Sequence, residues 1–404
     1  MLDLLKLTLI LALTIWLLTR RWDLGLILLI DTALAALLYA YPPLKALSSA
    51  FQGLVSLDTF NLVGAVFLML TLAELLRRTQ SIENMVTALQ TVVPDSRAVL
   101  AVIPALIGLM PMLGGAMFSA PMVNGIGTRL KLSPARKTFV NYWFRHAMEY
   151  VWPLYTSVLL TAALVGIAPN AFIAASYPLS LAAIAGGLLW GLMGVPRGDL
   201  AGNGGRKRAA WRDLLVSIWP LLLVILLVVI LQLHMLLSLV GVIVLFALVK
   251  RIGLRQWPEI LRRSFPLRTF SAVFGVMIFK RVVEDAGAVE TIPAALGDLG
   301  LSPMLVGFVV PHLVGLLTGT PPAAIALSIP LVAPVMERTG LEPAVAAVWM
   351  FVGAFSGIML SPLHLCLALT REYFGAYWGR LYRLIAPATA LVVAVALVLV
   401  LWSR

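Results

Sequence analysis

Long apolar runs alternate with short polar segments along the whole chain. Runs of this length predict helices that are embedded in a membrane. They fall near Leu4–Leu18, Leu24–Tyr41, Leu54–Leu76, Tyr142–Val165, Ala171–Val195, Leu214–Leu231, Leu236–Val249, Phe270–Val283, Ala344–Leu369 and Leu384–Leu401. The pattern therefore predicts an all-α polytopic membrane protein.

Two further apolar segments are interrupted at their middle by glycine and proline. They are PALIGLMPMLGGAMFSAP, from Pro104 to Pro121, and PHLVGLLTGTPPAAIALSIP, from Pro311 to Pro330. A membrane-crossing helix needs roughly 20 apolar residues, so arms of about a dozen residues are too short to cross. Two short arms joined by helix breakers predict a re-entrant hairpin. Irregular backbone at membrane depth is tolerated only where protein buries it or water reaches it, so each tip is a candidate site.

The two halves of the chain match each other residue by residue. Pro104 matches Pro311 at an offset of 207, and beyond the tips Pro121 matches Pro330 at an offset of 209. Further matched pairs are Gly108 with Gly315, Ser119 with Ser328, Arg129 with Arg338, Pro134 with Pro343 and Pro153 with Pro362. We expect a first repeat over residues 1–195, a cytoplasmic linker over 196–212 and a second repeat over 213–404. Each repeat is expected to hold five transmembrane helices and one re-entrant hairpin.

An odd number of crossings places the second repeat in the membrane upside down, so the repeats are predicted to be inverted. The basic residues agree with this, because cytoplasmic loops carry an excess of Lys and Arg. With the N-terminus outside, the inside segments hold Arg20, Arg21, Arg77, Arg78, Arg97, Arg129, Lys131, Arg136, Lys137, Arg206, Lys207, Arg208, Lys250, Arg251, Arg255, Arg262, Arg263, Arg371 and Arg380. The outside segments keep few, such as Lys45 and Arg338. We expect a multi-pass protein of the cell inner (plasma) membrane with both termini outside.

A proline lies late in the run that follows each hairpin, in Tyr150-Val151-Trp152-Pro153 and in Met359-Leu360-Ser361-Pro362. Proline removes one helical hydrogen bond and clashes with the preceding turn. A plain proline kink is one interpretation, and a helix broken opposite each hairpin is the other. Broken helices near the midplane present positive N-termini to an anion and free carbonyls to Na⁺, as in secondary transporters with inverted repeats.

Small and polar residues near the tips and breaks are the candidate substrate and ion ligands. Each of them could instead serve close helix packing, the commoner role of small residues in membranes. The candidates are Gly114, Gly115, Ser119, Asn124, Thr318, Gly319, Thr320, Ser328, Ser356, Gly357 and Ser361.

Ionisable residues inside an apolar run indicate a functional site more strongly than small polar residues do, because a charged side chain in a membrane has a high energetic cost. Arg145, His146 and Glu149 lie in the run after the first hairpin. Arg145 and Glu149 are spaced to neutralise one another on a helix face. Alternatively, Arg145 binds a substrate carboxylate and Glu149 carries a coupling proton or lines a Na⁺ site. The second half has Ala354 and Ile358 at the matching positions, so this feature is asymmetric.

Three other ionisable residues in apolar runs are weaker candidates. Asp31, in the second run, fits a proton relay or a buried structural contact equally well. His312 and His364 are expected to serve packing rather than to bind a ligand.

Composition narrows the class of protein. Of the 404 residues 61% are hydrophobic and 12% charged, whereas about a quarter are charged in soluble domains. The net charge of +12 does not indicate nucleic-acid binding, because the basic residues lie in short loops between apolar runs. Cys366 is the only cysteine, which excludes an internal disulfide. The sequence has no HExxH, GxSxG or paired-aspartate pattern, so an enzyme is not expected.

The architecture resembles the ion-transporter superfamily, which includes divalent-anion/sodium symporters and citrate and gluconate permeases. The resemblance is carried by GLMPMLGGAMFSAP with WPLY, and by GLLTGTPPAAIALSIP with SPLH. Within that group the chain is most similar to a branch of integral membrane proteins, the domain of unknown function 401. It departs from the dicarboxylate symporters, whose Ser-Asn-Thr tip motif is absent. The resemblance implies a homodimer with a scaffold and a moving transport domain.

The sequence thus predicts a secondary active transporter that moves a small organic anion of carboxylate type by alternating access, coupled to Na⁺ or H⁺. A cation/proton antiporter without organic substrate is the alternative, and a membrane-embedded enzyme is a weaker one. Membrane lipid and the anion are the expected partners, and nucleic acid is not. No cofactor is expected, and no metal other than Na⁺ at the hairpin tips.

Overall fold

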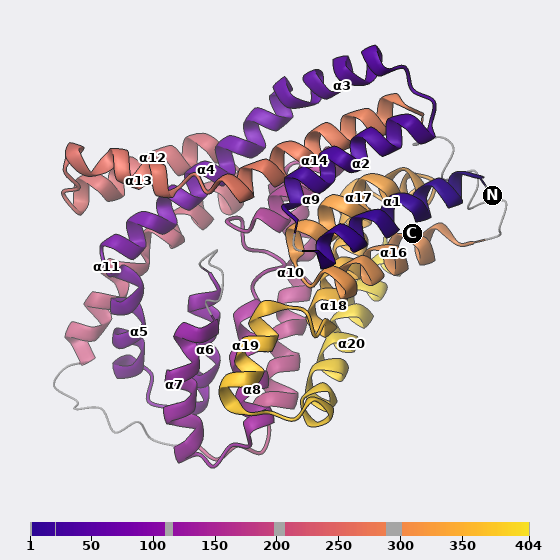
Figure 1. Cartoon of the computed structure of the whole chain (residues 1–404). Helices are drawn as coiled ribbons and strands as arrows, with labels where there is room; N and C mark the ends of the chain where they lie inside the picture. The colour runs from indigo at the N-terminus through magenta and orange to yellow at the C-terminus, as the bar shows by residue number, and fades with distance from the viewer. Residues whose placement is uncertain (1, 21, 110–115, 198–206, 288–300, 404) are drawn as a thin grey trace.

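The computed structural model describes residues 2–20, 22–109, 116–197, 207–287 and 301–403, and these form helices joined by short connections (Figure 1). In the first half the helices are α1 (Leu2–Thr19), α2 (Leu24–Leu38), α3 (Pro43–Val55), α4 (Leu57–Arg78), α5 (Ser81–Val92), α6 (Ser96–Gly108), α7 (Ala116–Arg129), α8 (Pro134–His146), α9 (Thr156–Val165), α10 (Pro169–Gly186) and the π-helical η1 (Gly187–Leu192).

In the second half they are α11 (Lys207–Ile225), the π-helical η3 (Leu226–Ile230), α12 (Met235–Val249), the 3₁₀ turn η4 (Leu254–Gln256), α13 (Trp257–Arg263), α14 (Leu267–Asp285), α16 (Pro303–Thr318), α17 (Pro321–Glu337), α18 (Pro343–Leu360), α19 (Leu365–Phe374) and α20 (Trp378–Trp402).

Local sequence signals explain where many of these helices begin. The side chains of Asp23, Ser56, Asp95 and Ser133 accept hydrogen bonds from free backbone N–H groups at the starts of α2, α4, α6 and α8. Proline occupies the first helical turn of α8, α10, α16, α17 and α18, where its missing N–H costs nothing. The caps therefore set the boundaries of the hairpins and of the helices that follow them.

The helices form two groups. In one, α14 packs against α2 and α3, and α12 packs against α4; these helices run along the top of the molecule in Figure 1. In the other, α16 and α17 pack against α18, α6 and α7 against α8, and α10 and α18 against α20. The hairpins and the helices that follow them therefore belong to the second group.

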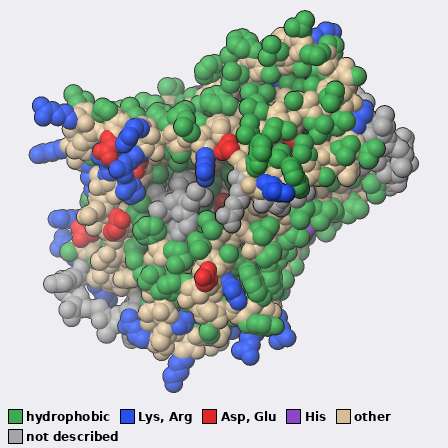
Figure 2. Space-filling model, viewed as in Figure 1, with side chains coloured by type: hydrophobic (Ala, Val, Ile, Leu, Met, Phe, Trp, Pro, Cys, Tyr) green, Lys and Arg blue, Asp and Glu red, His purple; other side chains and the backbone are tan. Residues whose placement is uncertain are grey.

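The surface and the helix lengths fit a membrane protein. Among the residues that the structure describes, five stretches are long and apolar enough to cross a bilayer: Leu57–Arg78, Pro169–Leu192, Lys207–Ile230, Pro343–Phe374 and Trp378–Trp402. Figure 2 shows that hydrophobic side chains cover most of one face, with Lys and Arg gathered toward its edges. The runs around α2 and α12 form helices of 15 residues each, which are short for a crossing. Five crossings in each half therefore stay a prediction.

Each half contains a helical hairpin followed by a broken helix. The hairpins are α6–α7, whose tip at residues 110–115 lies outside the described residues, and α16–α17, which turns at Gly319. The helix after the first hairpin ends at His146 and resumes at Thr156; the helix after the second ends at Leu360 and resumes at Leu365. Plain proline kinks are thus excluded, because the backbone leaves the helical path for several residues.

Candidate functional site

The first hairpin is locked to the first break by backbone contacts. A Cβ on Gly108 would overlap the carbonyl oxygen of Arg145, so only glycine allows α6 to approach α8 this closely. Within the break, Trp152 Nε1 donates to the carbonyl oxygen of Leu109 at 2.9 Å, and the Tyr155 hydroxyl donates to that of Gly108. The last carbonyls of α6, which have no helical partner, are satisfied in this way.

The second hairpin is locked to the second break in the same manner. A Cβ on Gly315 would overlap the carbonyl oxygen of Ala354. Ser361 Oγ donates to the carbonyl oxygen of Leu316 at 2.6 Å, and His364 Nδ1 lies 2.6 Å from that of Gly319. Gly315, Ser361 and His364 are the residues that the sequence alignment pairs with those of the first junction. The two halves therefore use equivalent positions, with different side chains, to join hairpin and break.

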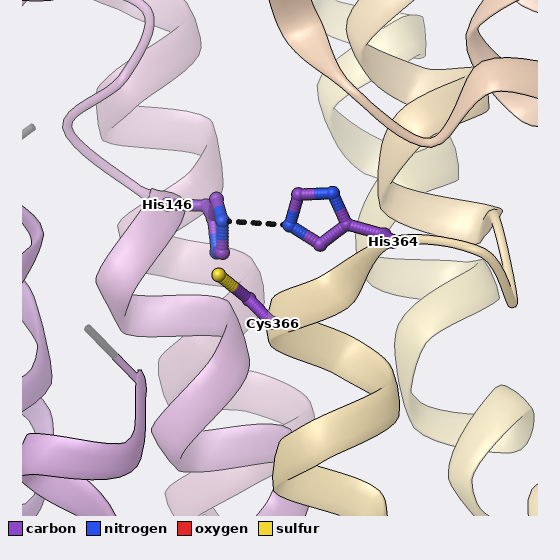
Figure 3. Close-up of side chains that lie close together, drawn as sticks. All are labelled: His146, His364 and Cys366. Atoms are coloured by element: carbon purple, nitrogen blue, oxygen red, sulfur yellow. Dashed lines mark hydrogen bonds between the residues drawn. The ribbon is translucent and has the colours of Figure 1, made fainter. Parts of the chain in front are cut away.

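The two junctions meet at the centre of the second helix group. His146, the last residue of α8, faces His364, which precedes α19, and their Nε2 atoms lie 3.2 Å apart (Figure 3). Cys366, the second residue of α19, points at the same spot, and the three ligand atoms lie within 4.8 Å of one another. Tyr142 covers the pair, with its ring centroid 4.8 Å from that of His146. All of these side chains are buried.

Two opposite charges flank the histidine pair. Arg145 is 4% exposed, and its Nη1 donates to the carbonyl oxygen of Ile107 at 3.0 Å. Glu149 is also 4% exposed, and its Oε2 lies 3.9 Å from His146 Nε2. Because α8 ends at His146, Glu149 lies in the following turn and not one turn along the same helix. Arg145 and Glu149 therefore do not share one continuous helix face, and Glu149 lies near His146; their mutual neutralisation stays a prediction.

Several predicted small residues are accounted for by helix packing. Ser119 Oγ donates to the carbonyl oxygen of Ala116 within α7, and Ser328 Oγ to that of Ala324 within α17. Asn124 lies at the α7–α8 interface, where its Oδ1 accepts from Lys137 Nζ at 2.9 Å. Gly114 and Gly115 fall outside the described residues. Within the described part of the first hairpin, the contribution to the site is the carbonyl oxygen of Ile107, which accepts from Arg145, rather than a polar side chain.

The second hairpin places more of its predicted residues near the junction. Thr318 ends α16, and its buried Oγ1 has no hydrogen-bond partner among the described residues. Gly319 follows with a positive φ of 63°, and Thr320 is exposed at the start of α17. Thr318 and Gly319 therefore line the tip beside His364.

Two predicted residues lie where α18 crosses α16. Ser356 Oγ lies 2.9 Å from His312 Nδ1, so His312 has a partner between the two helices. A Cβ on Gly357 would overlap the carbonyl oxygen of His312, which makes this glycine a packing position between α16 and α18.

Reasoning from sequence did not identify Cys366 and Tyr155 as junction residues. It named His364 but assigned it to packing rather than to ligand binding. His364 and Cys366 directly follow the second break, and Tyr155 is aligned with His364, which is the signal that could have identified them. Asp31, by contrast, lies on α2, where its Oδ2 accepts from Thr14 Oγ1 of α1 at 2.6 Å.

A separate cavity of about 490 Å³ lies away from the junction. It is bordered by α4, α9, η3 and the start of α12, and its polar lining includes Asp58, Asn61, Gln232 and His234. The histidine pair is not part of this cavity.

Comparison with known proteins places the chain by family and by fold. The family model described as "Protein of unknown function (DUF401)" matches residues 3–402. No curated protein matches the chain. Among solved structures, MtrF of Neisseria gonorrhoeae superposes with a TM-score of 0.59 at 15% sequence identity, over 88% of this chain and 83% of that one. MtrF is described as one of a class of antimetabolite efflux pumps. At this identity the likeness shows a shared fold.

Proposed function

We propose that this chain, which belongs to the DUF401 family, is a secondary active transporter of a small organic anion of carboxylate type. The observation that carries the proposal is the meeting of two broken helices at His146 and His364, each locked to its own hairpin. Secondary transporters with inverted repeats build their substrate sites from discontinuous helices of this kind.

The matched junctions support inverted repeats and alternating access. Gly108 and Gly315 occupy aligned positions, and each packs on a backbone carbonyl at an aligned position of the following helix. Two equivalent hairpins that approach one site from opposite sides can open it alternately to each side. We propose that the helices around α14 form the scaffold and that the hairpin group moves against it.

The charges at the junction support an anionic substrate. Arg145 is held at the junction by the end of α6, and a buried guanidinium binds a carboxylate strongly and with defined geometry. The fold shared with MtrF, an efflux pump, supports active transport in general. We propose coupling to Na⁺ or H⁺; the sequence has no nucleotide-binding loop, so ATP drive would require a separate subunit.

The proposal is tested by thermal unfolding of the detergent-purified protein with a panel of organic anions, in Na⁺ and in K⁺. A ligand at a hundred times its dissociation constant stabilises the folded state by about 2.7 kcal/mol, which raises the unfolding midpoint measurably. We expect at least one carboxylate to stabilise the protein more in Na⁺ than in K⁺, or more at one pH than another. A midpoint that responds to cation or pH but to no anion would overturn the symporter and favour the antiporter.

A further inference from the structure

Both histidines of the junction turn Nδ1 toward a backbone carbonyl. His146 Nδ1 lies 2.8 Å from the carbonyl oxygen of Tyr142, and His364 Nδ1 lies 2.6 Å from that of Gly319. A carbonyl oxygen only accepts hydrogen bonds, so each Nδ1 carries the ring hydrogen and donates it. In a neutral imidazole the other nitrogen then bears a lone pair. Both Nε2 atoms are therefore acceptors.

These two acceptors nevertheless face each other across 3.2 Å. Two lone pairs at that distance repel, so either one ring is protonated and donates an N–H···N hydrogen bond to the other, or a metal cation lies where both nitrogens can reach it. In a tetrahedral zinc site with Zn–N bonds of about 2.0–2.1 Å, the two nitrogens lie about 3.3 Å apart. The observed separation of 3.2 Å therefore fits a shared metal ion. Histidine ligands of metals also usually donate their other N–H to a carbonyl or carboxylate, as both rings do here.

Cys366 offers the third ligand. Its Sγ and the two Nε2 atoms lie within 4.8 Å of one another, and a tetrahedral site with a Zn–S bond of about 2.3 Å would place sulfur about 3.6 Å from each nitrogen. A shift of about 1 Å closes that difference. The thiolate is the form of cysteine that binds metals.

We propose that His146, His364 and Cys366 form a binding site for a soft or borderline d¹⁰ cation, Zn²⁺ or Cu⁺. A thiolate with two imidazoles selects these ions over Mg²⁺ or Ca²⁺, which prefer oxygen ligands. Three protein ligands leave a fourth position, and the Glu149 carboxylate, 3.9 Å from His146 Nε2, lies next to it. The site bridges the two halves of the chain, so bound metal would hold the junction closed. The proposed metal site can be tested independently of the proposed transport function, because metal binding is measured without any transported anion.

The first experiment uses the full-length protein, purified without a histidine tag and stripped with a chelator. Co²⁺ is titrated in as a coloured substitute for Zn²⁺, followed by competition with Zn²⁺; Cu⁺ is titrated separately under anaerobic conditions against a chromogenic chelator. We expect one equivalent of metal and, with Co²⁺, a sulfur-to-cobalt charge-transfer band. Since Cys366 is the only cysteine, such a band in the unaltered protein assigns the site without any variant.

Variants then test the ligand set. Cys366→Ser should abolish the charge-transfer band. His364→Ala should weaken metal binding by more than about 100-fold, because losing a residue that only orients a ligand weakens binding by up to about 100-fold. His234→Ala is the matched control, because this histidine precedes α12 and lies outside the cluster; it should bind metal as the unaltered protein does. Absence of Co²⁺, Zn²⁺ and Cu⁺ binding in the unaltered protein, or binding without a thiolate band, would overturn the proposal. Metal binding without any anion effect would instead refute the proposed transport function alone.

Discussion

Arg145 donates a hydrogen bond to the carbonyl oxygen of Ile107. The aligned position in the second half holds Ala354, so this charge is present in the first half alone. We predict that Arg145→Ala abolishes the stabilisation by an organic anion while the protein still folds, because the guanidinium binds substrate charge. The measurement is the unfolding midpoint with and without the anion. Arg129→Ala, an exposed change at the end of α7, is the control and should keep the anion response.

A structural role for Arg145 predicts a different result. Removing one partner of a buried charge pair costs about 3–5 kcal/mol, because the other charge is left uncompensated. In that case Arg145→Ala would lower the midpoint without any anion present, and adding Glu149→Gln would partly restore it. That pattern would contradict the substrate role of Arg145.

At the level of single residues, the sequence predicted the charges but not their partners. Arg145, His146 and Glu149 stand out because charged residues are rare in apolar runs. His364 and Cys366 did not, since His146 lies in the other half, 218 positions from His364 along the chain. Such a contact depends on how the two halves pack, and no local pattern encodes it.

At the scale of elements, the second hairpin depends on the tight turn at Gly319. Its φ is 63°, and a Cβ there would lie 2.8 Å from the backbone nitrogen of His364. Gly375 caps α19 with a φ of 64°, but a Cβ there would meet nothing within 4 Å. In both alanine variants the left-handed backbone lowers the free energy of unfolding by about 1–2 kcal/mol. We predict that Gly319→Ala loses about 1–3 kcal/mol more, because the hairpin must move away from the break.

Chemical or thermal unfolding of the two glycine variants measures this difference. Gly319→Ala should also weaken metal binding, since the carbonyl of this residue orients His364, whereas Gly375→Ala should leave metal binding unchanged. Equal losses of stability in the two variants would show that the hairpin tip is not clamped to the break.

The hairpins and breaks were predictable because glycine and proline act locally on the backbone. Pro153 and Pro362 marked the breaks, and the structure interrupts the helices around both. The sequence could not give the lengths of the short helices such as α2, because an apolar run continues through a cap or turn without any change in hydropathy. Pro153 predicted a break upstream of itself, but it did not show how far upstream α8 would end, which is at His146.

For the whole molecule, the order of elements agrees with a repeated unit. Hairpin α6–α7, broken helix α8–α9 and α10 in the first half correspond to α16–α17, α18–α19 and α20 in the second. This order alone is the same for parallel and inverted repeats, so the orientation in the membrane has to be measured. The homodimer that the resemblance implies also stays a prediction.

Arg129 and Arg338 are the pair of positions that separates the two orientations. They are aligned in the sequence, both are exposed, and each lies at the end of the second arm of its hairpin. We predict that inverted repeats place Arg129 in the cytoplasm and Arg338 outside. With Cys366→Ser removing the native thiol, a membrane-impermeant maleimide should label Arg338→Cys in intact cells and Arg129→Cys only after permeabilisation. Lys45→Cys should label like Arg338→Cys, since both are expected outside. Labelling of both arginine positions from one side would mean parallel repeats, and the two hairpins could not then approach the histidine pair from opposite faces of the membrane.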